Sequence, residues 1–327
     1  MTRVYLTIDT EYSSGLANGA CPVDRTENFA RSIACFTPDG PAGITYQLKM
    51  FERHGIRAVF FVDPMPALLW GIAAIEDVVT PILNAGQDVQ LHCHTEWLRL
   101  AGAGSPLRGL SGGHIKDFDF DEQCRILDWA RDALVAAGAP KPVAFRAGNY
   151  GANNDTLRAL AAVGLRYDSS HCPALVGTGA CDIDLGAGDQ LPMLYEGVIE
   201  VPAGCIAEAG GGLRHAQITA LSLREMKAAI RNARNTNTTS FTLVSHSFEL
   251  INRRKQAVNR VVQRRFDGLC SWLEAAHNIA TANYRGTPPL HVGETNLPRR
   301  AGQQPLAPSV LRTWPRLAEQ AVSNIFY

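Results

Sequence analysis

The sequence opens with an apolar, β-branched run, residues 4–8, that leads into two carboxylates, Asp9 and Glu11. Such a run predicts a buried strand, and α/β sheets present their active sites at the carboxyl ends of their strands. Two neighbouring anions raise one pKa and attract a cation. The pair therefore predicts a general base beside a metal, although two solvated acids at a strand end would give the same pattern.

A second group of reactive side chains, His92, His94 and Glu96, stands at alternate positions from the end of another predicted strand, residues 88–92. In an extended chain, residues two apart point to the same side, so all three could face one cation. If the chain turns after His92, then His92 and Glu96 could converge instead. Imidazoles and carboxylates suit zinc with positions open for water and substrate. The structural alternative is a buried Cys93 flanked by histidines on a polar face.

Two more apolar runs end in polar residues, one at Arg146 and the other at His246. A single histidine at a strand end is usually structural. Reactive groups at four separate strand ends are harder to explain by chance, so we predict one site built from all of them. A serine hydrolase using Ser245 or Ser247 is disfavoured, because the sequence has no Gly-x-Ser-x-Gly elbow.

Strand-like and helix-like segments alternate along the chain, which is the pattern of a parallel α/β fold. The predicted strands are residues 4–8, 57–62, 88–92, 142–145, 165–168, 197–202 and 240–245. The predicted helices are residues 45–54, 75–85, 121–137, 153–163, 221–234, 258–278 and a short one at 309–325. Long loops are expected at residues 12–43, 99–114 and 173–196.

Composition narrows the class of protein. The 31 basic and 31 acidic residues balance, which disfavours electrostatic binding to nucleic acid or to an anionic membrane. No apolar run approaches the roughly 20 residues of a membrane span, and no export signal is recognised. The eight cysteines form no Cys-x-x-Cys pair and are expected to be reduced thiols. We therefore expect a cytoplasmic protein, and the sequence gives no indication of its oligomeric state.

The expected organisation is one catalytic domain with a small C-terminal addition. Residues 1–285 contain all the alternating segments, whereas the composition then turns to Pro, Gly and Gln. Residues 286–327 are predicted to be a Pro/Gly-rich linker followed by a peripheral helix.

The order of these motifs resembles the polysaccharide deacetylases, whose domain is called the NodB-homology domain or carbohydrate esterase family four. The resemblance rests on an Asp-x-[Asp/Glu] pair, a histidine cluster, Arg-x-Gly-x-Tyr-Gly, Asp-Ser-Ser and a late strand ending in histidine, over roughly residues 1–280. The segments Ile-Asp-Thr-Glu, His-Cys-His-Thr-Glu-Trp and Ser-His-Ser-Phe-Glu are similar to the WalW-type branch, which is associated with surface-polysaccharide genes. The resemblance implies an α/β fold, a NodB-like distorted (β/α) barrel with roughly seven parallel strands.

The resemblance also implies a role for each matching residue. These roles are Asp9 as the general base, Glu11 and His92 as metal ligands, Arg146 as the cation that keeps Asp9 ionised, Asp168 as the acid that anchors Arg146, and His246 as the acid that protonates the departing amine. From the residues alone, Asp168 could equally cap a helix or form an Asx-turn.

Two parts of the family pattern are altered in this sequence. The second histidine of the family motif would fall at Glu96, so the third metal ligand is either His94 or Glu96. We favour His94, because it lies on the same side of an extended segment as His92. Asn149 and Tyr150 stand in the turn where the family holds the oxyanion with a backbone N–H, and Asn149 takes that register. The family's proline is absent, so glycine must shape this turn.

We therefore predict a hydrolase that uses a divalent metal, Zn²⁺ by preference, to remove an N-acetyl group from an amino sugar. The substrate would be a carbohydrate with an acetamido group, in a surface polysaccharide or its precursor. One alternative is a deformylase, an O-deacylase or another C–N amide hydrolase on the same scaffold, because acyl specificity depends on pocket shape. Another is a catalytically silent carbohydrate-binding domain.

Overall fold

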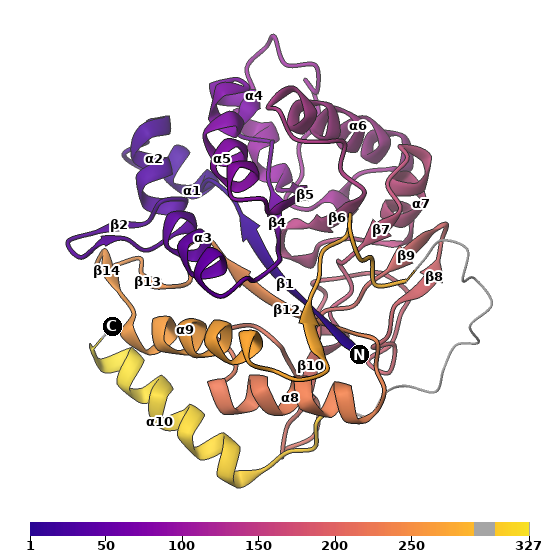
Figure 1. Cartoon of the computed structure of the whole chain (residues 1–327). Helices are drawn as coiled ribbons and strands as arrows, with labels where there is room; N and C mark the ends of the chain where they lie inside the picture. The colour runs from indigo at the N-terminus through magenta and orange to yellow at the C-terminus, as the bar shows by residue number, and fades with distance from the viewer. Residues whose placement is uncertain (291–304, 327) are drawn as a thin grey trace.

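The computed structural model describes residues 1–290 and 305–326, and a curled, mostly parallel sheet organises this part of the chain (Figure 1). The sheet has nine strands in the order β12-β1-β4-β5-β6-β7-β9-β8, with β15 also paired to β1. The strands are β1 (Thr2–Thr10), β4 (Ala58–Val62), β5 (Asp88–Cys93), β6 (Ala144–Ala147), β7 (Tyr167–Asp168), β8 (Met193–Tyr195), β9 (Val198–Glu200), β12 (Ser240–His246) and β15 (Ile279–Thr281). Within this sheet, all described pairs are parallel except β8 with β9. The prediction of a parallel α/β architecture is therefore confirmed.

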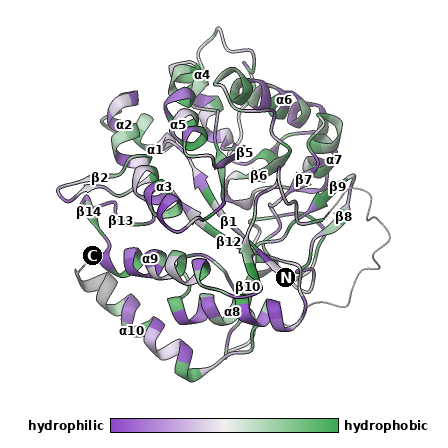
Figure 2. Ribbon diagram, in the orientation of Figure 1, coloured by the Kyte–Doolittle hydropathy of each residue, from purple (hydrophilic) through white to green (hydrophobic). Residues whose placement is uncertain are grey.

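Helices cover the outer face of the curled sheet (Figure 1). The main ones are α3 (Ile44–Arg53), α5 (Ala73–Asn84), α6 (Phe120–Ala136), α7 (Asn154–Ala162), α8 (Leu223–Asn235) and α9 (Arg260–Glu274). Figure 2 shows both hydrophilic and hydrophobic residues on these helices, as expected when one face of each helix packs on a sheet.

The side chains of β1 alternate between two apolar layers. Val4, Leu6 and Ile8 belong to the large core between sheet and helices. Tyr5 belongs to a smaller core inside the curl, with Phe61 and Tyr284. Because successive strand residues point to opposite faces, Thr7 and Asp9 continue the inner row that Tyr5 begins. The side chain of Asp9, the predicted base, therefore points to the inside of the curled sheet, away from the helices.

Two loop predictions and one helix prediction need correction. Residues 12–43 include α1 (Ser14–Ala17), α2 (Arg25–Ser32) and a hairpin of β2 (Phe36–Thr37) and β3 (Gly40–Pro41), and residues 173–196 include β8. The prediction missed α2 because its sequence, RTENFARS, has almost no apolar face, although the Asp24 side chain caps it by accepting from the Glu27 N–H. The predicted helix at 258–278 ends at Glu274 and is followed by β15.

A segment outside the main sheet covers the exposed edge of β12. It contains the hairpin of β10 (Cys205–Ala207) and β11 (Leu213–His215). The Gly204 N–H donates to the Thr242 carbonyl at 3.0 Å, and the Val244 N–H donates to the Ala216 carbonyl at 2.9 Å. Backbone groups of β12 on this side are thus hydrogen-bonded, although no further strand of the main sheet follows.

The C-terminal helix α10 (Val310–Phe326) packs against α8 and α9 (Figure 1). Arg316 and Glu225 form a buried ion pair across this contact, with 3.1 Å between Nε and Oε1. Most of the predicted linker, residues 291–304, lies outside the described residues. Within residues 1–290 and 305–326, no helix combines the length and the apolar character that a bilayer crossing requires.

Candidate active site and metal centre

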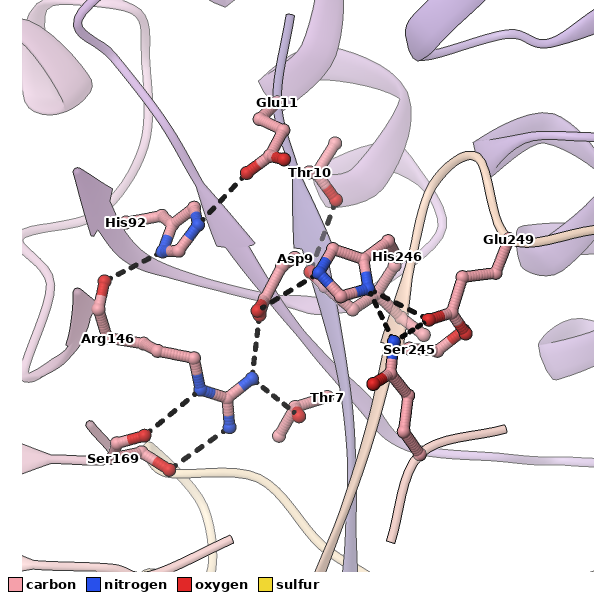
Figure 3. Close-up of polar contacts among 12 residues, drawn as sticks. Thr7, Asp9, Thr10, Glu11, His92, Arg146, Ser169, Ser245, His246 and Glu249 are labelled. Carbon is pink, nitrogen blue, oxygen red and sulfur yellow. Dashed lines mark hydrogen bonds and ion pairs between the residues drawn. The ribbon is translucent and has the colours of Figure 1, made fainter. Parts of the chain in front are cut away.

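Strand register brings the four predicted strand ends to one place. Asp9 of β1 lies beside His246 of β12, and His92 of β5 lies beside Arg146 of β6. The four side chains approach one another at the carboxyl edge of the sheet (Figure 3). Three of them, Asp9, His92 and His246, line a cavity of about 230 Å³. Its other lining residues are Glu11, His94, Ala147, Asn149 and Tyr150.

Glu11, His92 and His94 form a cluster that could hold a metal ion. Their ligand atoms all lie within 4.8 Å of one another. Oε2 of Glu11 is 3.1 Å from Nε2 of His92 and 2.6 Å from Nε2 of His94. A mixed set of two imidazoles and one carboxylate is typical of catalytic zinc sites that keep a coordination position open.

The other nitrogen of each imidazole has its own partner. Nδ1 of His92 lies 2.7 Å from the Arg146 carbonyl oxygen, which requires Nδ1 to carry the proton and leaves the Nε2 lone pair for a cation. Nδ1 of His94 lies 3.1 Å from Oε2 of Glu96. Glu96 is thus placed behind His94 as its orienting carboxylate, in agreement with the preference for His94 as the third ligand.

The electrostatics of the cluster favour a positive charge. Burial alone would raise the pKa of Glu11, but the two imidazoles bring this pKa well below its usual value. Burial alone would lower the pKa of His94, but the carboxylates of Glu11 and Glu96 raise it well above its usual value. The donor atoms and the charge of the pocket therefore fit a divalent cation.

Arg146 holds the carboxylate of Asp9 in place. Its side chain is 1% exposed, and NH1 donates to Oδ1 of Asp9 at 2.6 Å and to the Thr7 hydroxyl at 2.9 Å (Figure 3). The guanidinium also lies 4.4 Å above the ring of Phe61. Because burial is costly for an unpaired arginine, the contact with the Asp9 carboxylate stabilises this guanidinium in the interior.

The expected anchoring of Arg146 by Asp168 is not observed among the described contacts. Nε and NH2 of Arg146 donate instead to the carbonyl and the hydroxyl of Ser169, at 3.2 and 3.0 Å. Asp168 is in register with Phe145 and Glu200, so its side chain points to the opposite face of the sheet from Arg146.

On that face, Asp168 accepts from the hydroxyl of Ser170 at 2.7 Å and shares a hydrogen bond with Glu200. Burial and the neighbouring Asp168 raise the pKa of Glu200 well above its usual value, so Glu200 retains the proton of the pair. Ser170 also accepts from the Ala147 N–H at 2.9 Å. Asp168 thus supports the backbone next to Arg146, rather than its side chain.

His246 faces Asp9 on one side and a third carboxylate on the other. Its Nε2 lies 3.9 Å from Oδ2 of Asp9, and its Nδ1 lies 3.0 Å from Oε1 of Glu249 (Figure 3). Burial alone would lower the pKa of His246, but the hydrogen bond and charge of Glu249, together with Asp9, raise it to about 9. The imidazolium form is therefore favoured at neutral pH.

The turn that carries Asn149 and Tyr150 has an unusual backbone. Both residues have positive φ, 54° and 59°, a region in which a bulky residue such as tyrosine is rare. In the described part of the chain, no hydrogen bond from either backbone N–H to a group outside this turn is found. Gly148 permits the turn's close approach to the metal cluster, since a Cβ there would lie 2.7 Å from Nδ1 of His94. Asn149 and Tyr150 both line the cavity, and their role at an oxyanion stays a prediction.

Sequence reasoning assigned no role to Glu249, Ser169 or Asp63. Asp63 follows β4 directly, is 1% exposed, and accepts from the His94 N–H at 3.4 Å. Burial raises its pKa to about 7. The rule that identified Asp9, a carboxylate just after an apolar strand, also applies to Asp63. Glu249 lies three residues after His246 in Ser-His-Ser-Phe-Glu, a spacing that one turn can bring together.

The serine alternative finds no support in the structure. The Ser245 hydroxyl donates to Glu249 at 3.0 Å, and the Ser247 hydroxyl donates to the Ser32 carbonyl at 2.8 Å. Both side chains are fully buried, so neither hydroxyl is placed to attack a substrate.

No protein-family model and no curated protein match this chain, but solved structures do. A protein from Mycobacterium smegmatis that carries the provisional name polysaccharide deacetylase superposes with a TM-score of 0.53 at 19% identity, over 85% of this chain and 86% of that one. This similarity confirms the α/β, NodB-like fold expected from the sequence, which in this structure is a half-barrel.

Two weaker similarities involve family 4 carbohydrate esterases. The Streptomyces lividans enzyme in complex with acetate has a TM-score of 0.42 at 12% identity, over 94% of this chain and 98% of that one. An acetyl xylan esterase from Clostridium thermocellum in complex with a cobalt ion has a TM-score of 0.39 at 12% identity, over 86% of this chain and 87% of that one.

Proposed function

We propose that the protein is a metal-dependent hydrolase that removes the acetyl group from an N-acetylated sugar. The observation that carries this proposal is the position of Asp9. Its carboxylate is fixed by Arg146 at 2.6 Å, faces His246 at 3.9 Å, and opens into the same cavity as the Glu11, His92 and His94 cluster. A base, an acid and a metal-binding set around one cavity are the groups that amide hydrolysis needs.

The bound cation would polarise the acetamido carbonyl and make water more acidic. Asp9 accepts the proton of the water that attacks the carbonyl carbon. The backbone N–H groups of Asn149 and Tyr150 hold the developing oxyanion. His246 then donates its proton to the sugar nitrogen as the C–N bond breaks, and acetate and the free amine leave.

Glu249 keeps His246 protonated for this step. A neutral imidazole at this position could not donate a proton, whereas the carboxylate at Nδ1 stabilises the imidazolium and fixes the orientation of its ring. The two carboxylates near His246 thus have different roles. Asp9 accepts the proton of the attacking water, and Glu249 raises the pKa of His246.

Several finer features belong to the same proposal. We assign Zn²⁺ as the metal because the ligand set of two histidines and one carboxylate suits it. A surface polysaccharide of the WalW-type branch as substrate, a cytoplasmic location, and the division into residues 1–285 and 286–327 rest on the sequence alone.

The experiment measures acetate release from a panel of N-acetylated sugars and oligosaccharides, with and without added Zn²⁺. We expect acetate from at least one substrate in the metal-loaded enzyme and none in an Asp9→Asn variant. Formate release, or release only from O-acylated sugars, would favour the deformylase or O-deacylase alternative. Binding of sugar without release of any acid would favour the silent domain.

A further inference from the structure

A second cavity of about 120 Å³ lies beside the proposed catalytic one. The two share Glu11, His94 and Asn149 in their walls, so they are directly adjacent. The remaining lining of the second cavity is Tyr12, Ser13, Ser14, Ser32, Glu96, Trp97, Phe248 and Arg253. Tyr12, Ser32 and Trp97 are buried, whereas the hydroxyls of Ser13 and Ser14 and the ring of Phe248 are partly exposed. Hydroxyls beside an aromatic ring are side chains that sugar rings contact, which suits a neighbouring sugar unit.

Arg253 brings a positive charge to this cavity. It lies in the turn between β13 (Ile251–Asn252) and β14 (Ala257–Val258), and its guanidinium stands 4.6 Å above the ring of Phe248. The Phe248 ring in turn lies 5.1 Å from the ring of His246. The Phe248 ring thus lies between His246, the proposed acid, and the guanidinium of Arg253. This contact places the guanidinium next to the catalytic cavity.

No carboxylate pairs with the Arg253 guanidinium in the described residues. Many other arginines of the chain do have such partners, for example Arg158 with Glu196. The next two residues, Arg254 and Lys255, are exposed and also basic, so the turn is a local positive patch on a chain of zero net charge. The guanidinium of Arg253 is therefore available to a ligand.

The hairpin of β13 and β14 that carries Arg253 is packed against the rest of the protein. Ile251 and Val258 pack with Cys35 and Ala42 from the β2–β3 region, and the Ser247 hydroxyl donates to the Ser32 carbonyl at 2.8 Å. Figure 1 shows β13 and β14 beside β2. A guanidinium carried by two mutually packed hairpins can hold a carboxylate in one geometry.

We propose that the second cavity binds an acidic sugar, with Arg253 pairing with its carboxylate. This inference rests on the proposed function, since it places the acidic sugar next to the N-acetylated unit in the catalytic cavity. The substrate would then be an anionic glycan in which an N-acetylated amino sugar adjoins a uronic acid. Arg253 would determine specificity and take no part in the chemical step.

The test compares two oligosaccharides of equal length. One alternates N-acetylglucosamine with glucuronic acid, and the other is its carboxyl-reduced form, in which glucuronic acid has become glucose. Calorimetry with the Zn²⁺-loaded Asp9→Asn protein measures the affinity without turnover. We expect the acidic oligosaccharide to bind about tenfold more tightly, because a charge-assisted pair is worth on the order of that factor. Arg253→Gln should abolish the difference, and Arg254→Gln, the matched control, should retain it.

Equal affinity for the two oligosaccharides, or binding of neither, would overturn the inference. An equal loss in Arg254→Gln would also do so, because it would indicate general charge attraction. If Arg253→Gln weakens UDP-N-acetylglucosamine instead of the acidic oligosaccharide, the anion is a phosphate and the carboxylate assignment is wrong. Acetate release by the wild-type protein is measured in parallel. Selective binding of the acidic oligosaccharide without acetate release would contradict only the proposed function. Acetate release at the same rate with and without the Arg253 side chain would contradict only this inference.

Discussion

Nδ1 of His246 lies 3.0 Å from Oε1 of Glu249, so the proposed acid has a carboxylate of its own, separate from the base Asp9. The hydroxyl of Ser245 fixes the second oxygen of Glu249 at 3.0 Å. Glu249 can therefore act on the imidazole in one orientation only.

Replacement of Glu249 by Gln should shift the pH dependence of hydrolysis. Because Glu249 raises the pKa of His246 to about 9, the proton-donating form is present below this pH and is lost as the pH rises through it. In Glu249→Gln the pKa falls, so the alkaline limb of kcat/KM should move to lower pH. A pH–rate profile checks this, with Glu274→Gln as a control at an exposed carboxylate. An unmoved alkaline limb would exclude His246 as the titrating acid.

Replacement of Asp9 by Asn should cut kcat by about 10²–10⁴, the range of a general base, while the metal content stays the same. Asp9 is outside the cluster of Glu11, His92 and His94, which explains the expected separation of the two effects. Steady-state kinetics and metal analysis on the same preparation measure both. Loss of the metal together with activity would instead make Asp9 a ligand.

His94 and Glu96 should differ in their effect on metal affinity. His94→Ala removes a ligand and should abolish stoichiometric binding. Glu96→Gln keeps a hydrogen-bond partner for Nδ1 of His94 but removes its charge, so affinity should fall by about 10–100-fold. Competition with a chelating dye gives both constants. If the losses came in the reverse order, Glu96 would be the ligand.

Replacement of Gly148 by Ala should weaken metal binding without a direct loss of a ligand. The added Cβ would lie 2.7 Å from Nδ1 of His94 and 2.8 Å from the Cys93 carbonyl, so the imidazole must move. Gly102→Ala is the control, since a Cβ there meets no atom within 4 Å and the backbone needs no positive φ. Unchanged metal affinity in Gly148→Ala would mean that the turn adjusts and leaves His94 in place.

The ion pair between α8 and α10 should contribute to stability. Arg316 and Glu225 are 5% and 2% exposed, so Arg316→Ala leaves a buried carboxylate without its partner. We expect a loss of about 3 kcal/mol in the free energy of unfolding. Arg158→Ala breaks an exposed pair and should cost less than about 1 kcal/mol. Urea unfolding compares the two, and equal losses would argue against a structural role for α10.

The sequence predicted those parts that depend on local pattern. Residues 57–62 are apolar after Arg57 and mark a buried strand, and residues 88–92 alternate polar and apolar side chains up to His92, as a strand does. The strands β2 and β3 have only two residues each, which is too short for a hydrophobic pattern that would predict them.

The partners of the predicted groups were harder to foresee, because strand register and side-chain parity decide them. Asp168 was expected at Arg146, but register pairs it with Phe145 and turns it to the other face, so that Ser169 takes its place. A sequence shows that a carboxylate follows a strand; it does not show which neighbour that strand will have.

The segment that lies along β12 has a consequence for the behaviour of the molecule in concentrated solution. A half-barrel leaves a strand edge open, and an open edge invites β-pairing between copies and aggregation. Here the backbone of β12 is already hydrogen-bonded to Gly204 and Ala216, and the opposite edge strand, β8, has only three residues. The sheet can thus stay open over its cavity without exposing a long edge to another chain.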